Sequence, residues 1–379
     1  MKIQKWHLFA FVTLLFGFSF YVINLKFDKF YRVNGINNDN RVLIEKYLTK
    51  DEMSYLIENQ IKINDFIDYI EYDEFYLHNY QYYNLLKDTK RYKQQDILTI
   101  GNQLASKLIN LFENKAYTYA KKLVDHTLES AFLNKEDFDF DYIDIYIYLS
   151  KLYTTNDFSF IEDTHAYVSI LKNKGITNKD DLNQIIYELS ACYNKDTLKE
   201  FLNTDLSDDI TMVLKPTSLS SIVDKEHYIG KYEPSKLLLV QDVPRVRYTM
   251  YLQNDAYNAL LDMYKDISQN FNGFLLRKSY VNYESLDTTQ VGFDEFQLGL
   301  SIVVSKQGIS YNQFEGTDIS LWLEEHAHEY GFTLRYPKNK ASITGYTHDS
   351  HIYRYVGKDL AKTLYDFSLC LEEYNLLQE

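Results

Sequence analysis

The sequence is poor in cysteine. Only Cys192 and Cys370 occur among its 379 residues, and no C-x-x-C spacing is present. Two thiols are too few for the disulfide framework of a small secreted domain. They leave two alternatives open: a single bridge between Cys192 and Cys370 outside the cell, or two buried free thiols.

Basic residues are also scarce relative to acidic ones. Lys and Arg total 40 against 54 Asp and Glu, which gives a formal charge of −14. An acidic chain without a local basic stripe repels phosphate backbones, so nucleic acid is excluded as a partner. The 4 prolines beside 36 tyrosines indicate a base-composition bias of the source genome and not a tyrosine-based function.

Hydrophobic residues are plentiful. They make up 45% of the chain, and aromatic residues alone make up 16%. This composition provides enough apolar side chains for real cores and excludes global disorder. The length favours two folded domains over one.

The N-terminus combines a charged start with a long uncharged run. Lys2 and Lys5 precede residues 6–25, WHLFAFVTLLFGFSFYVINL. As a helix this run is about 30 Å long, enough to cross a bilayer core. It ends in bulky residues without an A-x-A cleavage site. We therefore predict a short cytoplasmic tail at residues 1–5, an uncleaved transmembrane signal-anchor at residues 6–25, and an extracellular remainder. Basic residues also follow the run, so charge alone leaves the orientation open.

The middle of the chain, residues 40–214, has a mostly helical pattern with short polar breaks. Thr49 and Glu52 have the spacing of a capping box that starts a helix. Residues 64–66 and 156–158 begin two loosely similar stretches, which leaves a degenerate repeat and chance similarity as alternatives. No pattern of catalytic residues occurs here, and we interpret this region as a stalk or a partner-binding module.

A new unit begins near Tyr232. Apolar residues fall on one face of a helix over residues 254–267. Asp318 is placed to cap a further helix, and Gly331 to end it. Strand-like segments alternate with these helices, so the sequence predicts a compact α+β domain over residues 232–379.

The amino-acid sequence of this C-terminal segment resembles the zinc-dependent D,D-carboxypeptidase (VanY-type) family. The strongest matches are WLEEHAHEYGFTLRYPKNKASITGY at Trp322–Tyr346 and HIYRYVGKDLA at His351–Ala361. YEPSKLL and Gln297-Leu-Gly-Leu support them, and the likeness runs from about Tyr232 to Leu371. The resemblance implies a zinc peptidase that is secreted or membrane-anchored and trims D-alanine from peptidoglycan stem peptides.

The residues that the resemblance assigns to zinc are mostly replaced. A catalytic zinc site takes three protein ligands and leaves a position for water. The family pattern S-x-H-x-x-G-x-A-x-D aligns with Asp294–Val303. Phe296 then stands at the histidine position and Val303 at the aspartate position, and neither can coordinate a metal. Only His351 keeps a ligand position, so we expect no bound zinc.

The resemblance also implies a catalytic base and a substrate-binding arginine. The pattern E-x-W-H aligns with His348–His351, which puts His348 at the base position and Ser350 at the tryptophan position. The pattern S-G-Y-R aligns with residues 278–281. Tyr280 is retained for substrate binding, but Val281 replaces the arginine that holds the substrate carboxylate.

Other residues offer a way to rebuild a metal site. His348 and His351 lie three residues apart, and two histidines with one carboxylate form a legitimate zinc set. The carboxylates near them in the alignment are Asp294, Glu295 and Asp349. A pair of loop histidines without metal is the preferred interpretation. His326 and His328 are two residues apart on a predicted helix and face different directions, so we expect neither to be a ligand.

Three functional hypotheses follow. The first is a membrane-anchored, non-hydrolytic cell-surface module that binds stem peptides or an envelope protein through the old cleft. The second is an active metallo-carboxypeptidase with rearranged ligands. The third is a structural envelope protein that acts through its helical region. A polar cleft near Tyr280 and His351 favours the first, and bound metal favours the second. A core filled by Phe296 and Val303 favours the third.

Overall fold

A computed structural model describes residues 5–30, 33–111 and 113–378. Contacts between Cα atoms divide the chain into two compact units, residues 1–141 and 142–379. This division falls inside the predicted helical region, and the predicted domain boundaries stay a prediction. Residues 1–4 of the predicted tail lie outside the described part.

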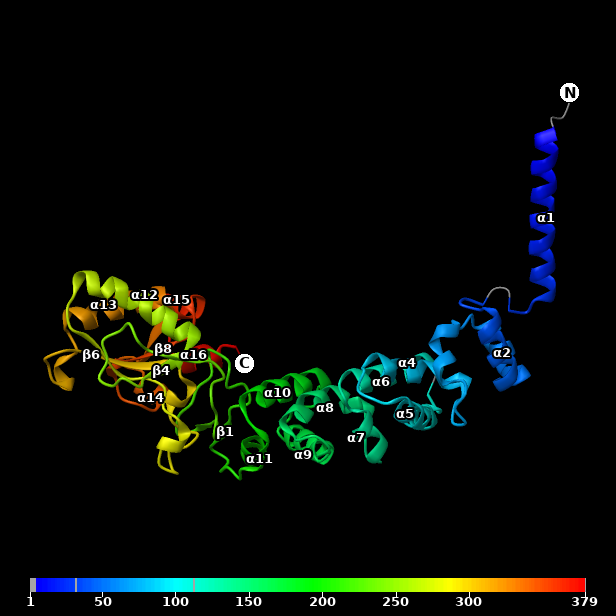
Figure 1. Cartoon of the computed structure of the whole chain (residues 1–379). Helices are drawn as coiled ribbons and strands as arrows, with labels where there is room; N and C mark the ends of the chain where they lie inside the picture. Colours follow the sequence, from blue (N-terminus) through cyan, green and yellow to red (C-terminus); the bar gives the residue numbers. More distant parts are fainter. Residues whose placement is uncertain (1–4, 31–32, 112, 379) are drawn as a thin grey trace. The chain divides into compact units, whose positions relative to one another are not determined.

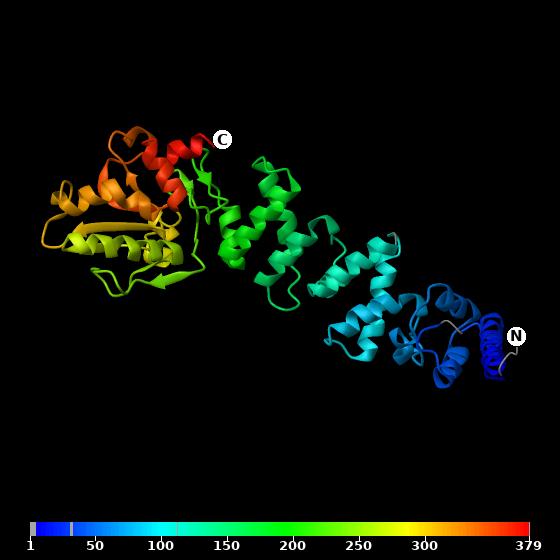
Figure 2. The same cartoon turned by 90° about the horizontal axis from the view of Figure 1, so that it is seen from above.

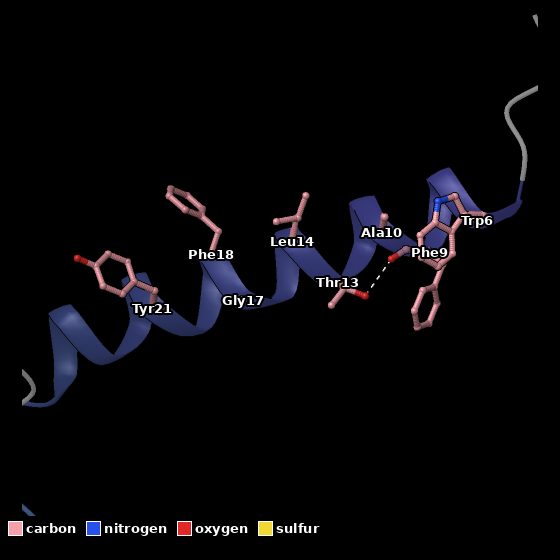
Figure 3. Close-up of a pocket in the computed structure, with 8 residues that line it drawn as sticks. All are labelled: Trp6, Phe9, Ala10, Thr13, Leu14, Gly17, Phe18 and Tyr21. Carbon is pink, nitrogen blue, oxygen red and sulfur yellow. Dashed lines mark hydrogen bonds between the residues drawn. The ribbon is translucent and has the colours of Figure 1, made fainter.

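Helix α1 spans Lys5–Phe27 and contains the predicted transmembrane run. Within it, Trp6–Ile23 form the one described helical stretch that is long and apolar enough to cross a membrane. Figure 3 shows a hollow along this helix, lined only by its own side chains, with Thr13 Oγ1 donating to the carbonyl of Phe9 at 2.9 Å. The hollow contains no charged group and has no features of a reaction site.

The first unit continues with short helices, as predicted. They are α2 (Asn38–Tyr47), α3 (Lys50–Glu58), α4 (Tyr80–Asp88), α5 (Gln94–Leu108), α6 (Glu113–Asp125) and α7 (Glu129–Asn134). The predicted capping box at the start of α3 is confirmed. Glu52 N donates to Thr49 Oγ1 at 3.2 Å, and Thr49 N donates to the Glu52 carboxylate at 2.8 Å.

The second unit begins with four more helices, α8 (Ile143–Leu149), α9 (Phe160–Asn173), α10 (Lys179–Cys192) and α11 (Lys195–Asn203). Tyr193, which follows α10, contacts the start of the C-terminal domain. Its hydroxyl donates to the carbonyl of Ile229 at 2.6 Å, and its ring lies edge-on to that of Tyr232. Cys192 and Cys370 are free thiols, and Cys370 is buried.

The C-terminal domain is built on a four-stranded antiparallel sheet with the order β5-β6-β8-β7. Two small sheets pair β1 with β2 and β3 with β4. Helices α12, α13 and α15 lie along one face of the main sheet (Figures 1 and 2). The α+β prediction is therefore confirmed. The strands are β1 (Thr211–Met212), β2 (His227–Tyr228), β3 (Leu237–Leu239), β4 (Tyr251–Gln253), β5 (Phe274–Lys278), β6 (Ser301–Lys306), β7 (Phe332–Tyr336) and β8 (Asp349–Tyr355). The helices are α12 (Asn254–Asn270), α13 (Asp318–His326), α14 (Ala341–Thr344), α15 (Lys358–Asp366) and α16 (Leu371–Leu376).

The ends of α13 follow from local chemistry. Its N-cap is Thr317, whose side chain accepts from Ser320 N, so the predicted cap at Asp318 is one residue late. A 3-10 turn continues the helix, and Gly331 ends it with a φ of 89°. This left-handed conformation suits glycine, and its role as a stop is confirmed.

Candidate functional site

Strands β5, β6 and β8 place three side chains, Lys278, Val303 and Ile352, in one row across the main sheet. Val303 of β6 lies opposite Lys278 of β5 and opposite Ile352 of β8. Directly opposed residues in an antiparallel sheet point to the same face. Residues next to them in the sequence, such as Ile302 and Tyr353, are buried on the other face, where Tyr353 lines a cavity together with residues of α13 and α15.

Phe296 lies beside this row in a 3-10 turn that follows Asp294. The Asp294 carboxylate accepts from Phe296 N at 2.7 Å and therefore positions the ring. The Lys278 ammonium sits 3.8 Å from the ring centroid of Phe296 and 3.3 Å from the Asp294 carboxylate. A lysine over an aromatic face makes a favourable cation–π contact. The expected first ligand position is thus buried under a fixed positive charge.

His351 does not lie in this row, so its predicted place beside Phe296 and Val303 is wrong. The His351 side chain lies on the other face of β8, because the residue paired with Val303 is its neighbour Ile352. Its ring stacks between Tyr311 and Phe314.

Both ring nitrogens of His351 also have partners. Nδ1 lies 2.6 Å from the carbonyl oxygen of Val304, and Nε2 lies 2.9 Å from that of Tyr311. A metal ligand needs a nitrogen lone pair directed at the metal, and here each nitrogen is directed at a carbonyl oxygen.

Because Ile352 and not His351 lies opposite Val303, the alignment of the family pattern E-x-W-H with this chain moves by one residue. Ile352 then takes the third ligand position, His351 the tryptophan position and Asp349 the carboxylate position. Asp349 accepts from the Tyr311 hydroxyl at 2.9 Å and from His351 N at 2.9 Å. His348, predicted at the base position, donates from Nδ1 to the carbonyl of Tyr336 at 2.9 Å.

The residues present do not fit zinc. Phe296, Val303 and Ile352 supply no metal-binding atom at the three ligand positions. Across residues 5–30, 33–111 and 113–378, no group of three or more His, Cys, Asp or Glu side chains is arranged to hold a metal ion. The rebuilt set around His348 and His351 therefore does not form. His326 instead contacts Glu329 at 3.1 Å, and the His328 ring stacks on Tyr365.

A pocket of about 510 Å³ survives next to the vacated positions. It lies beside Tyr280 and Val281, and Val281 N donates to the carbonyl of Phe296 at 3.2 Å. The Tyr280 hydroxyl is buried without a hydrogen-bond partner among the described residues. Burial and the nearby Glu233 carboxylate raise the pKa of Tyr280 to about 12, so this hydroxyl keeps its proton at neutral pH.

Charged side chains of both signs line this pocket. Arg247 is exposed and makes no ion pair or hydrogen bond that we find in the described structure. Glu233 accepts from Asn282 Nδ2 at 3.0 Å. The pocket thus offers one available guanidinium near the position where Val281 replaces the expected arginine. Sequence reasoning missed Arg247, because none of the matched motifs contains it.

Sequence reasoning also missed a buried ionic network beside the row, where Ser301 lies opposite Arg354 on the same face of the sheet. Glu295 accepts from Arg354 Nη1 at 2.7 Å and from the Ser301 hydroxyl at 2.6 Å, and it lies 3.3 Å from Arg335 Nε. Arg335 also pairs with Glu372 of α16 at 2.6 Å. Burial opposes the charged form of Glu295, but the two guanidinium groups outweigh it and hold its pKa below the usual value. Both arginines stand in the stretches quoted for the family resemblance, which was the available signal.

The fold and the row of replaced positions define a carboxypeptidase-like α+β domain. The family model described as D-alanyl-D-alanine carboxypeptidase (VanY) matches residues 277–358. The carboxypeptidase YodJ of Bacillus subtilis (strain 168), so named by similarity, is 31% identical over 199 residues, which cover 44% of this chain and 70% of YodJ. The chain therefore belongs to the D-alanyl-D-alanine carboxypeptidase (VanY) family.

Further relatives match over shorter stretches. A D-alanyl-D-alanine carboxypeptidase of Enterococcus faecalis (strain ATCC 700802 / V583) is 41% identical over 83 residues, which cover 22% of this chain and 30% of that protein. Among solved structures, the LdcB LD-carboxypeptidase is 29% identical, with a TM-score of 0.41, over 45% of this chain and 92% of LdcB. VanYB in complex with D-alanine-D-alanine is 22% identical, with a TM-score of 0.34, over 42% of this chain and 98% of that chain. One VanY structure is a complex with Zn(II).

Proposed function

We propose that this protein is a membrane-anchored cell-surface module whose carboxypeptidase-like domain binds peptidoglycan-type peptides without hydrolysing them. The observation that carries the proposal is the contrast between two neighbouring places. The three ligand positions are apolar, whereas the pocket beside Tyr280 keeps polar and charged groups. Loss of the metal site with retention of the peptide pocket is the expected outcome for a binding protein.

The absence of hydrolysis rests on the chemistry of the row. Cleavage of a peptide by a metallo-carboxypeptidase needs a metal-activated water and a base that takes its proton. Phe296, Val303 and Ile352 provide no ligand, and Asp349 is engaged by the Tyr311 hydroxyl. The pseudoenzyme interpretation therefore does not depend on His351, whose expected position proved wrong.

Peptide binding rests on the pocket. A free peptide carboxylate pairs well with the planar guanidinium of arginine. Arg247 supplies such a group in the pocket that Val281 also lines, and the Tyr280 hydroxyl of the same pocket has no hydrogen-bond partner among the described residues. These groups suit a short peptide with a free C-terminus.

The anchor and the helical region complete the proposal. Helix α1 would hold the protein in the membrane with the bulk of the chain outside, and the helical region would act as a stalk or bind an envelope protein. The burial of Phe296 and Val303, at 7% and 8% exposure, favours a second candidate function. This second candidate is a purely structural envelope role without peptide binding.

The test uses the full chain in lipid nanodiscs and a stem pentapeptide that ends in D-alanyl-D-alanine. We expect saturable binding by calorimetry, no D-alanine release by chromatography, and a loss of affinity of about tenfold or more in Arg247→Ala, since arginine–carboxylate pairs contribute about 1.5–3 kcal/mol. Arg277→Ala is the matched control, because Arg277 is exposed on β5 and does not line the pocket.

A C-terminally amidated pentapeptide separates carboxylate recognition from general adhesion and should bind as weakly as the intact peptide binds Arg247→Ala. Release of D-alanine would show that the protein is an active enzyme. Absence of any binding would leave the structural role as the better explanation.

A further inference from the structure

The pocket beside Tyr280 holds two opposite charges that do not pair with each other. Arg247 and Glu233 both line it and both are exposed, yet no ion pair joins them in the part of the chain that the structure describes. The pocket therefore offers a ligand one positive and one negative group. Complementary charges select between ligands, so such a pocket favours a ligand that carries one charge of each sign.

The Glu233 carboxylate is held in position by a neutral neighbour. Asn282 Nδ2 donates to this carboxylate at 3.0 Å. Asn282 is itself fixed at the start of a 3-10 turn, because its Oδ1 accepts from Glu284 N at 2.7 Å and its carbonyl accepts from the Ser285 hydroxyl at 2.7 Å. The amide thus orients the carboxylate without neutralising it. A charge that is positioned in advance loses little freedom when a ligand binds.

The described residues leave Glu233 without a paired cation. Lys231 comes two residues before it but pairs with Glu200 at 2.7 Å. Burial raises the pKa of Tyr280 to about 12, and the Glu233 and Glu284 carboxylates add to this shift. The electrostatic field at Tyr280 is accordingly negative, which is favourable for a cation that enters the pocket.

Given peptide binding at this pocket, as proposed above, we propose that the pocket selects a dipolar peptide, whose carboxylate pairs with Arg247 and whose ammonium group pairs with Glu233. A stem peptide with lysine as its third residue and a free C-terminus carries both groups. The three residues from that lysine to the C-terminus span about 10 Å when extended. The pocket, of about 510 Å³, has a volume in the usual range for small-molecule sites.

The pairing with Glu233 makes binding sensitive to cross-linking. A stem peptide that is cross-linked through its lysine amine carries a neutral amide in place of the ammonium group, and acylation removes the charge. The bound peptide would then cover the Glu233 carboxylate without pairing with it, which costs free energy. The pocket therefore favours stem peptides that are not cross-linked at this amine.

The experiment measures calorimetric binding of the full chain in lipid nanodiscs to the pentapeptide L-Ala-γ-D-Glu-L-Lys-D-Ala-D-Ala. The peptide is used unmodified, acetylated on the lysine Nε, and acetylated on its N-terminal amine. We expect Nε-acetylation to weaken binding about two- to fivefold, the range of an exposed ion pair, and N-terminal acetylation to have no effect. The comparison needs only the parent chain, so it does not depend on whether a variant folds.

Two variants assign the effect to one carboxylate. Glu233→Gln should bind the unmodified peptide about two- to fivefold more weakly, and Nε-acetylation should then cause no further loss. Glu284→Gln is the matched control, because Glu284 is an exposed carboxylate beside the pocket that does not line it. It should bind all three peptides as the parent does. Equal melting temperatures of the parent and both variants check that the fold is unchanged.

The outcomes separate this proposal from peptide binding itself. A loss on N-terminal acetylation that Glu233→Gln abolishes would support the dipolar pocket and assign the ammonium group to the peptide's N-terminus. Equal binding of all three peptides, or an acetylation loss that persists in Glu233→Gln, would overturn the dipolar pocket alone if Arg247→Ala still weakens binding. Absence of binding to every peptide would contradict the proposed function and the dipolar pocket together.

Discussion

Glu295 is the acceptor on which two buried guanidinium groups converge. Replacing it with glutamine leaves Arg335 and Arg354 without their shared anion, while both side chains remain at most 1% exposed. Breaking a buried ion pair by removing one partner costs about 3–5 kcal/mol. We therefore expect Glu295→Gln to lower the free energy of unfolding by about that amount in urea titrations. Glu284→Gln, at an exposed position, is the control and should change it little.

The same carboxylate makes stability depend on pH. Its pKa in the folded protein lies below the ordinary value of 4.5, so its contribution to stability is fully present above pH 4.5. That contribution is lost as the pH falls through the lower pKa of the folded state. The stability difference between the parent and Glu295→Gln should accordingly shrink below pH 4.5 in urea titrations. A difference that stays constant down to pH 3 would show that the charge of Glu295 is not what stabilises the domain.

Rebuilding the metal site tests the corrected register. Phe296→His with Val303→Asp buries two polar groups without partners, which costs about 1–3 kcal/mol each and should lower the melting temperature. Adding Ile352→His should let the triple variant take up about one equivalent of zinc and recover stability, since binding to the folded state alone stabilises it. The double variant, which relies on His351, should not. Zinc in the double variant that disappears on His351→Ala would contradict the register.

The error at His351 has a simple physical origin. The family pattern E-x-W-H ends in histidine, and aligning its last position on His351 displaced the comparison by one residue. In a strand a shift of one residue moves a side chain to the opposite face. For Phe296 and Val303 the sequence left a filled core and an open cleft as alternatives, and the structure shows both side chains buried.

At the scale of the elements, glycines with positive φ hold the turns around the site. Gly292 has a φ of 86°, and an added Cβ would lie 2.4 Å from the Tyr228 ring and 2.7 Å from Gly230 N. Gly308 has a similar φ of 83° but no atom within 4 Å of an added Cβ. Gly308→Ala thus reports the backbone strain alone, about 1–2 kcal/mol.

We expect Gly292→Ala to destabilise the domain by about 1–3 kcal/mol more than Gly308→Ala, because it adds a steric clash to the strain. Urea unfolding of the two variants measures the difference directly. Equal losses would mean that the Tyr228 ring moves aside without cost.

Helix starts were predictable to within one residue. Thr49 caps α3 as expected, whereas α13 is capped by Thr317 and not by the expected Asp318. Adjacent Thr, Asn and Asp residues have nearly equal N-cap preference, so local sequence cannot choose between neighbours.

At the scale of the whole molecule, the order of an apolar N-terminal helix, a helical region and an α+β domain was predictable from hydrophobic periodicity and motif resemblance. The ionic network and the pocket beside Tyr280 were not. Each depends on residues far apart in the sequence that only the tertiary fold brings together. Arg335 pairs with both Glu295 and Glu372, and Arg247 and Tyr280 line the same pocket.

The predicted topology has a direct test. If α1 anchors the protein with the remainder outside, protease added to intact cells should remove the C-terminal domain. The physical reason is that a stretch such as Trp6–Ile23 is stable across the bilayer while the polar bulk stays in water. Immunoblotting against the C-terminal domain measures the loss, with permeabilised cells as the reference. Complete protection in intact cells and digestion only after permeabilisation would contradict the topology.

The buried network also sets a sequence of events during biosynthesis. Arg335 and Arg354 are synthesised after Glu295 but before Glu372. During that time the two guanidinium groups have only the Glu295 carboxylate as their partner in the network. An unpaired charge cannot be buried cheaply. We therefore expect the C-terminal domain to close only after α16 has been made and synthesis has reached Glu372.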